Sequence, residues 1–92
     1  MTVKELLSGP EKWTQGSSAR DPSGKSWHVE YEHACCWCLW GAIRFCYPNI
    51  YQAAQIEERV RQVLLIGSIV DWNDAPERTY EEVMAVVEKA GI

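Results

Sequence analysis

Two segments in the second half of the chain repeat apolar residues at helical spacing. The first spans residues 49–67, and its apolar stripe consists of Ile56, Val60, Val63, Leu64 and Gly67. The polar side chains between these positions are expected to face solvent, and they are Glu57, Glu58, Arg59, Arg61 and Gln62. The second spans residues 79–91, with apolar positions at Val83, Val86, Val87 and Ala90. Both patterns predict amphipathic helices.

Capping signals mark where helices begin. Thr79 with Glu82, and Thr2 with Glu5, each fit a capping box, in which the two side chains satisfy each other's backbone N–H groups. Asn49 is the predicted N-cap of the helix that follows it. The chain therefore has a further short helix near its N-terminus, and Gly9-Pro10 ends it.

Residues 33–46 are apolar nearly all round, with Arg44 as the only clearly charged side chain after His33. A helix without a polar face is buried on all sides, so this segment is the predicted central helix. Gly41 lowers helix stability, and close packing against a neighbouring segment would account for it. Tyr47-Pro48 ends the run.

A turn is predicted at Asp21-Pro22-Ser23-Gly24, which has proline at the second position and glycine at the fourth. Strand-favouring residues flank it at positions 13–15 and 26–29, so a small β-hairpin is expected there. A second loop is expected at residues 71–76, which read Asp-Trp-Asn-Asp-Ala-Pro. The predicted fold is one mainly α domain over residues 1–92, with about four helices around a buried central helix and a small hairpin near the N-terminus.

The negative charge lies in the second half of the chain. Residues 1–46 carry five Lys/Arg and five Asp/Glu, whereas residues 47–92 carry four Lys/Arg and eight Asp/Glu, which accounts for the net charge of −4. Binding to a phosphate backbone needs clustered cations, so direct nucleic-acid binding through a basic patch is not expected. The acidic half is compatible with a basic protein partner.

The apolar stretches are too short to cross a membrane. The longest covers residues 34–43, well below the roughly 20 residues that a membrane-spanning helix needs. The first residues show no signal-peptide pattern, and three of the four cysteines lie within residues 35–38. Such a cluster fits reduced thiols better than a secreted disulfide framework, and we expect a cytoplasmic protein with no membrane partner.

The cysteine cluster contains a C-x-x-C spacing at Cys35 and Cys38. Dithiol redox enzymes carry this spacing in a βαβ setting, and no such pattern is present here. Zinc sites usually draw ligand pairs from two chain segments, whereas His28, His33 and the clustered cysteines all lie within residues 28–38. We therefore predict small buried hydrophobic side chains rather than a redox or metal site.

Two arrangements of residues offer alternative chemistry. Cys38 is a candidate nucleophile, with His28 or His33 as its base and Asp74 as the group that orients the histidine. A shallow ligand pocket would instead be formed by Trp72, Asn73 and Asp74, facing Arg20 and Asp21 of the hairpin. Both sets also have a structural interpretation, because Asn and Asp commonly order turns and cysteines commonly fill cores.

Four segments occur in order along the chain: Trp13-Thr14-x-Gly16; Ala19-Arg20-Asp21 with Gly24; Cys38-Leu39-x-Gly41-Ala42; and Trp72-Asn73-Asp74-Ala75-Pro76-x-Arg78-Thr79 with Glu82-Val83. With these segments the chain resembles a family of small uncharacterised bacterial and phage proteins that form a domain of unknown function. The resemblance spans most of the chain. It implies a compact domain often encoded on mobile or accessory DNA, it implies no known activity, and it points to Cys38 among the four thiols.

Three functions remain open on the sequence. We favour a non-enzymatic interaction or regulatory module without a cofactor, which binds a partner protein or a second copy of itself. The first alternative is a small cysteine-dependent enzyme that uses Cys38 with a histidine base. The second is a small-ligand binder with a cleft near Trp72.

Overall fold

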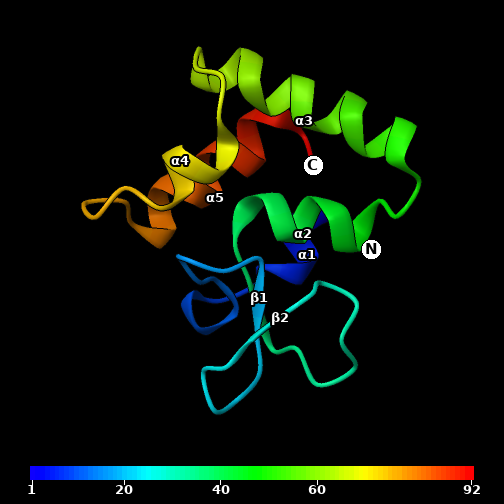
Figure 1. Cartoon of the computed structure of the whole chain (residues 1–92). Coiled ribbons are helices and arrows are strands. Elements are labelled where there is room, and N and C mark those ends of the chain that lie inside the picture. Colours follow the sequence, from blue (N-terminus) through cyan, green and yellow to red (C-terminus); the bar gives the residue numbers. More distant parts are fainter.

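The computed structural model describes residues 1–92 and consists of five α-helices, a short 3-10 helix and a three-stranded antiparallel sheet (Figure 1). In chain order the elements are α1 (Val3–Leu6), η1 (Pro10–Lys12), β1 (Ala19–Arg20), β2 (Ser26–Trp27), β3 (Cys36–Trp37), α2 (Leu39–Cys46), α3 (Ile50–Leu64), α4 (Ile69–Asn73) and α5 (Tyr80–Ala90). The expected mainly helical fold with a small sheet near the N-terminus is confirmed. There are five helices rather than about four, because Ile69–Asn73, which include the first three residues of the loop expected at 71–76, form α4.

Helix α2 lies between α3 and the sheet (Figure 1). It contacts α1, α3, α4 and β3. Leu39, Ala42 and Ile43 have no exposed surface, which confirms that the centre of the predicted buried helix is core. Helix α5 packs against α1 and α3 and closes the helical part.

The predicted helix starts are confirmed wherever the signal is local. Thr2 with Glu5 and Thr79 with Glu82 form complete capping boxes, and Asn49 Oδ1 accepts hydrogen bonds from two backbone N–H groups of α3. These side chains occupy N–H groups that have no partner inside their helices.

The prediction that residues 33–46 are all helical is wrong in its first part. The helix begins at Leu39, and Cys36–Trp37 form the strand β3, which pairs with β1. A short apolar run fits a buried strand as well as a buried helix, and its partner, the Ala19–Arg20 strand, is remote in sequence.

The hairpin is confirmed at its turn and corrected in its first strand. Strand β1 pairs with β2 across the predicted turn, with Ala19 opposite Trp27. Residues 13–15, which were expected to form the first strand, lie outside it, and Trp13 instead forms an isolated bridge with Trp37. Strand β1 is the middle strand, in the order β2-β1-β3.

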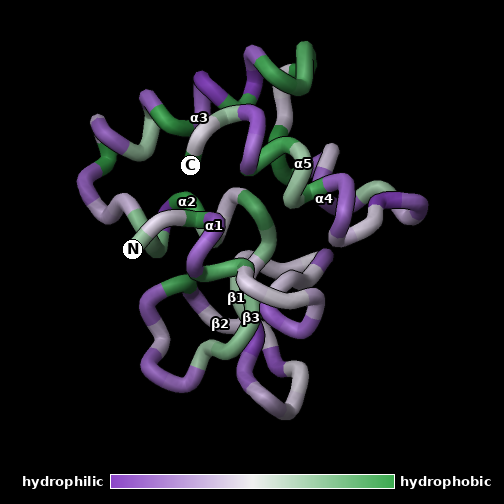
Figure 2. Tube along the Cα trace, turned by 180° about the vertical axis from the view of Figure 1, so that it is seen from behind, coloured by the Kyte–Doolittle hydropathy of each residue, from purple (hydrophilic) through white to green (hydrophobic).

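Helix α3 ends at Leu64, before the predicted limit at Gly67. A turn then leads to α4, with Ser68 as the N-cap of that helix. Figure 2 shows the end of α3 and this turn as a hydrophobic segment at the outer edge of the molecule. None of the helices combines the length and the hydrophobicity that crossing a membrane would require.

Candidate functional site

Asn73, at the end of α4, has no exposed surface and links three parts of the chain. Its Oδ1 accepts hydrogen bonds from the indole Nε1 of Trp13 at 2.7 Å and from the backbone N–H of Leu39 at 3.0 Å. Its Nδ2 donates to the carbonyl of Thr14 at 3.2 Å. A buried amide with these partners holds the fold together, because each partner would otherwise lose its hydrogen bond.

Asp74 continues this junction towards the surface. Its Oδ1 accepts from the backbone N–H of Gly16 at 3.0 Å and from Asn73 Nδ2 at 2.9 Å. Gln15 Nε2 donates to the carbonyl of Asn73 at 2.9 Å, so residues 13–16 are held against the end of α4. The other oxygen of Asp74, Oδ2, accepts no hydrogen bond from the chain.

Arg20 and Asp21 are occupied by contacts within the hairpin and with the preceding residues Thr14 and Gln15. The guanidinium of Arg20 donates to Thr14 Oγ1 at 3.0 Å and to the carbonyls of Gln15 and Gly24, each at 2.9 Å. Hydrogen bonds from the side chains of Ser23 and Trp27 lower the pKa of Asp21 to about 2. Both residues therefore order the turn, and neither faces Trp72, Asn73 and Asp74 across a pocket as predicted.

Trp72 contacts an arginine rather than an open pocket. The guanidinium carbon of Arg78 lies 4.0 Å from the centroid of the Trp72 ring, and Arg78 Nε donates to the Trp72 carbonyl at 2.8 Å. Arg78 also pairs with Glu82 at 3.1 Å in the first turn of α5. Trp72 thus fixes the connection between α4 and α5.

Cys38 is the N-cap of α2 and is 3% exposed. Its Sγ accepts a hydrogen bond from the backbone N–H of Gly41 at 3.2 Å. Burial raises the pKa of the Cys38 thiol, and the carboxylate of Asp74 raises it further, against the opposite effect of the α2 N–H groups. An activated cysteine has a lowered pKa, so this environment does not favour a nucleophile.

Gly41 confirms the predicted close packing of the central helix. A Cβ at this position would lie 2.0 Å from the carbonyl oxygen of Ser18, a separation that no side chain tolerates. The start of α2 is therefore in direct contact with the segment before β1.

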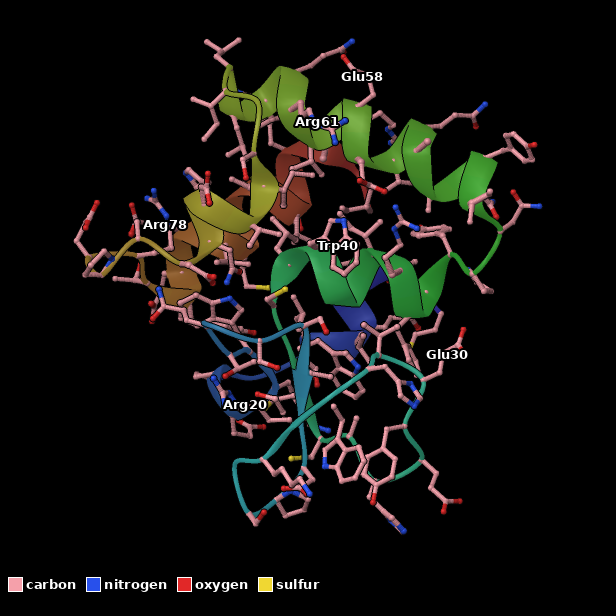
Figure 3. The ribbon with its side chains drawn as sticks, in the orientation of Figure 1. Arg20, Glu30, Trp40, Glu58, Arg61 and Arg78 are labelled. Atoms are coloured by element: carbon pink, nitrogen blue, oxygen red, sulfur yellow. The ribbon has the colours of Figure 1, made fainter.

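A hollow of about 250 Å³ opens beside this contact. Its lining consists of Cys38, Trp40, Val70, Asp74 and residues 16–18. Figure 3 shows Trp40 rising from α2 towards α3 on the face nearest the viewer, with Arg61 above it on α3. The hollow thus brings together two predicted site residues, Cys38 and Asp74, whereas Arg20, Asp21, Trp72 and Asn73 do not line it.

The two histidines lie away from this hollow, in the loop between β2 and β3. Both are exposed, and their rings pack against Tyr31 with centroid separations of 6.3 Å for His28 and 5.4 Å for His33. His33 also lies 3.6 Å from the carboxylate of Glu32. Neither histidine lines the hollow that contains Cys38, so the structure does not bring the predicted thiol and base together.

All four cysteines are free thiols. Burial raises the pKa of Cys36 and of Cys46, and the adjacent Cys35 raises that of Cys36 further. No group of three or more His, Cys, Asp or Glu side chains is arranged to hold a metal ion. The thiols outside the hollow therefore behave as partly buried apolar groups.

Glu57 corrects the prediction that it faces solvent, because it is 5% exposed. Its carboxylate lies 3.2 Å from Arg44 Nε of α2 and 3.4 Å from Arg61 Nη2 of α3. Arg61 Nε also donates to the carbonyl of Gly67 at 2.9 Å. This ion-pair group joins α2 to α3 and positions the turn that follows α3.

That turn exposes large apolar side chains. Leu65 is 86% exposed, Ile66 45% and Val70, on α4, 40%. Leu65 is the C-cap of α3 and has a left-handed backbone, with φ of 59°, a conformation that favours glycine. It also borders an open, shallow hollow of about 520 Å³ that contains Arg59 and Lys89, and Arg59 Nη2 donates to the carbonyl of Ala90 at the end of α5 at 2.6 Å.

Comparison with known proteins identifies the family of this chain. The model of DUF6197, a family of unknown function, matches residues 2–91. The chain belongs to the DUF6197 family. Comparisons with curated proteins and with solved structures find no match.

In this DUF6197 chain, three of the four segments that carried the family resemblance meet at one junction. Trp13 and Thr14 bond to Asn73, Gly16 bonds to Asp74, and Leu39, next to Cys38, bonds to Asn73. These hydrogen bonds need the particular side chains found in the segments, so the segments are explained by their role in stabilising the fold. The exposed apolar turn at Leu65 lies outside all four segments.

The sequence analysis did not identify Leu65, Val70 or Trp40 as site residues. Leu65 was missed because the expected helix extended past it to Gly67, and nothing in the sequence marks a left-handed leucine. Trp40 was assigned to a wholly buried helix, although it is only partly buried. The available sequence signal was the pair of apolar residues Leu65 and Ile66 directly before Gly67, at the end of the predicted helix.

Proposed function

We propose that this DUF6197 domain is a non-enzymatic interaction module that binds a partner protein at the α3–α4 corner, which we define as Leu65, Ile66 and Val70 with Trp40, which lines a hollow together with Val70. The observation that carries the proposal is Leu65. An 86% exposed leucine gains nothing from burial, and its left-handed backbone costs about 1 kcal/mol relative to glycine. A residue unfavourable on both counts is explained if a partner covers it.

A second exposed apolar group lies at the other end of α3, where Ile50 is 62% and Tyr51 78% exposed. Both have ordinary helical backbone, and isolated exposed apolar residues are common on proteins. This group therefore provides the matched control for the corner.

The geometry does not favour the two alternatives. The raised pKa of Cys38 and the distance of both histidines from its hollow oppose a cysteine-dependent enzyme. The hollow of about 250 Å³ is smaller than the roughly 300–1,000 Å³ that encloses a drug-sized ligand, so it fits a single side chain better.

The test is a capture experiment in lysate of the source organism with three proteins: the wild type, Leu65→Gly combined with Val70→Ser, and the control Ile50→Ser combined with Tyr51→Ser. The captured protein is then purified, and its Kd for each variant is measured by calorimetry. We expect the corner variant to bind at least about tenfold more weakly, and the control within about twofold of the wild type.

Equal affinity of the corner variant and the wild type would contradict the proposal. So would a wild type that captures no protein and sediments as a monomer at high concentration. Urea unfolding of each variant separates a loss of binding from a loss of folding, because Leu65→Gly by itself is expected to raise stability.

A further inference from the structure

We infer that the hollow beside α2 receives a lysine or arginine side chain of the partner, with the cation on Asp74 and the hydrocarbon stem against Trp40 and Val70. This inference rests on the proposed interaction function and specifies the chemistry of the partner. It follows from the hydrogen-bonding state of the groups that line the hollow.

Asp74 is a half-buried carboxylate without a cation. Its Oδ1 accepts two hydrogen bonds, its Oδ2 accepts none from the chain, and no Lys, Arg or His nitrogen lies within 4.0 Å of either oxygen. The buried Glu57, by contrast, has two arginines beside it. A partly buried negative charge is stabilised by a positive one, and only an external group can supply it here.

The two serine hydroxyls of the lining also act as acceptors. Ser17 Oγ donates its proton to the carbonyl of Ala19 at 2.7 Å, and Ser18 Oγ donates to the carbonyl of Trp27 at 3.4 Å. Each hydroxyl oxygen keeps lone pairs that accept hydrogen bonds. The N–H groups of Gly16 and Gly41 are taken by Asp74 and Cys38.

A lining that offers acceptors and a negative charge selects a ligand with donors and a positive charge. Lysine and arginine carry only donors in their side chains, whereas a carboxylate or phosphate would be repelled by Asp74. The excess of acidic residues in the second half of the chain attracts such a cation from a distance.

The apolar part of the lining matches the stem of a long basic side chain. Trp40 and Val70 line the hollow, and the ring of Trp40 already lies 5.0 Å from the guanidinium carbon of Arg44. Lysine and arginine cover apolar surface with their methylene groups while the charged end reaches a polar site. Apolar neighbours of that residue in the partner would then contact the α3–α4 corner.

The experiment is a titration of the ¹⁵N-labelled full chain, followed by NMR, with two tripeptides of equal length: acetyl-Val-Lys-Leu-amide and acetyl-Val-Gln-Leu-amide. We expect the lysine peptide to shift the amides of Cys38, Val70 and Asp74 and the indole N–H of Trp40. The glutamine peptide is expected to bind at least about fivefold more weakly than the lysine peptide. The affinity of the lysine peptide is expected to fall as salt is added.

Asp74→Asn is the matched variant, because its Oδ1 still accepts from Gly16 while the charge is removed. Asp71→Asn is the control, since Asp71 lies on the same helix, is exposed and does not line the hollow. The lysine peptide should bind Asp74→Asn about fivefold more weakly and Asp71→Asn within about twofold of the wild type. The comparison of the two peptides on the wild type does not depend on either variant folding.

Equal binding of the two peptides, or an unchanged Kd for Asp74→Asn, would overturn the inference. So would butylammonium binding as tightly as the lysine peptide, since the hollow would then be a site for free amines. Partner capture that is lost in Leu65→Gly, which leaves the lining of the hollow intact, but retained in Asp74→Asn would contradict this inference and leave the proposed function standing. The reverse pattern would contradict Leu65 as part of the binding surface and leave the interaction through the hollow standing.

Discussion

The junction at the start of α2 and the turn after α3 differ in how their residues contribute to the stability of the fold. At the junction, Gly41 is required by contact with Ser18, and the buried Asn73 has hydrogen-bond partners on both its oxygen and its nitrogen. At the turn, Leu65 occupies a left-handed position where the chain elsewhere uses glycine, since Gly91 caps α5 with φ of 71°. A Cβ on Gly67 would meet nothing within 4 Å.

This difference separates residues that serve the fold from residues that do not. The hydrogen bonds of the buried Asn73 at the junction stabilise the folded state, whereas the turn combines backbone strain with exposed apolar surface. The family-like segments belong to the first group, which explains why they reveal the fold and not the function.

The strongest test of the comparison is the pair Gly41→Ala and Gly67→Ala. The first places a methyl group against the Ser18 carbonyl and should lower the free energy of unfolding by about 3 kcal/mol. The second enters open space and should change it by less than about 0.5 kcal/mol. Urea unfolding measures both, and equal stabilities would remove the distinction between the two regions.

Asn73→Ala should rank next. It leaves the indole N–H of Trp13 and the N–H of Leu39 without their acceptor, at a cost of about 2–3 kcal/mol in the free energy of unfolding. Asn49→Ala, which removes an exposed cap of α3, should cost only about 1 kcal/mol. Equal decreases in the free energy of unfolding for Asn73→Ala and Asn49→Ala would show that Asn73 is not the centre of the junction.

Cys38 extends the comparison to reactivity. Its burial and raised pKa predict that iodoacetamide modifies it on the order of a hundredfold more slowly in the native protein than in urea. Mass spectrometry locates the modified residue, and the half-buried Cys35 in the same sample is the internal control. Rapid native labelling confined to Cys38 would instead support the cysteine-dependent enzyme.

The two C-caps should respond in opposite directions to substitution. Leu65→Gly relieves the left-handed strain and should raise the free energy of unfolding by up to about 1 kcal/mol. Gly91→Ala introduces that strain and should lower it by about 1 kcal/mol. Thermal and urea unfolding would refute the argument if Leu65→Gly proved destabilising.

The smallest effect concerns the hairpin turn and acid. The pKa of Asp21 falls from 3.8 in the unfolded chain to about 2 in the fold, so its contribution to stability is present above pH 3.8 and is lost as the pH falls towards 2. Asp21→Asn should therefore flatten the dependence of stability on pH in that interval. Asp71→Asn should keep the wild-type slope, and a similar flattening in both variants would argue against the Asp21 hydrogen bonds as the cause.

The features predicted well from the sequence are those whose partners lie close along the chain. The capping boxes at Thr2 and Thr79 involve residues three apart, and in the turn the side chain of Asp21 accepts a hydrogen bond from the backbone N–H of Ser23. Local geometry decides such structures, so a few residues suffice to specify them.

The features that were missed depend on distant partners. Residues 36–37 become a strand because β1 lies beside them, and Glu57 is buried because Arg44 of another helix faces it. Asn73 is of a residue type common in turns, but three of its side-chain hydrogen-bond partners lie 34 to 60 residues away. No period or spacing in the sequence carries that information.

The carbonyl of Ile92 accepts hydrogen bonds from the backbone N–H groups of Val3 at 2.7 Å and Lys4 at 3.3 Å. The first turn of α1 therefore finds its missing acceptor in the last residue of the chain rather than in solvent. One consequence is that residues 3 and 92 lie side by side, so a short glycine linker can connect them in an engineered chain. A circular permutant with that linker, opened at the exposed Ser23-Gly24 turn, should keep the helical core and the α3–α4 corner, and the linker would become an internal point of attachment.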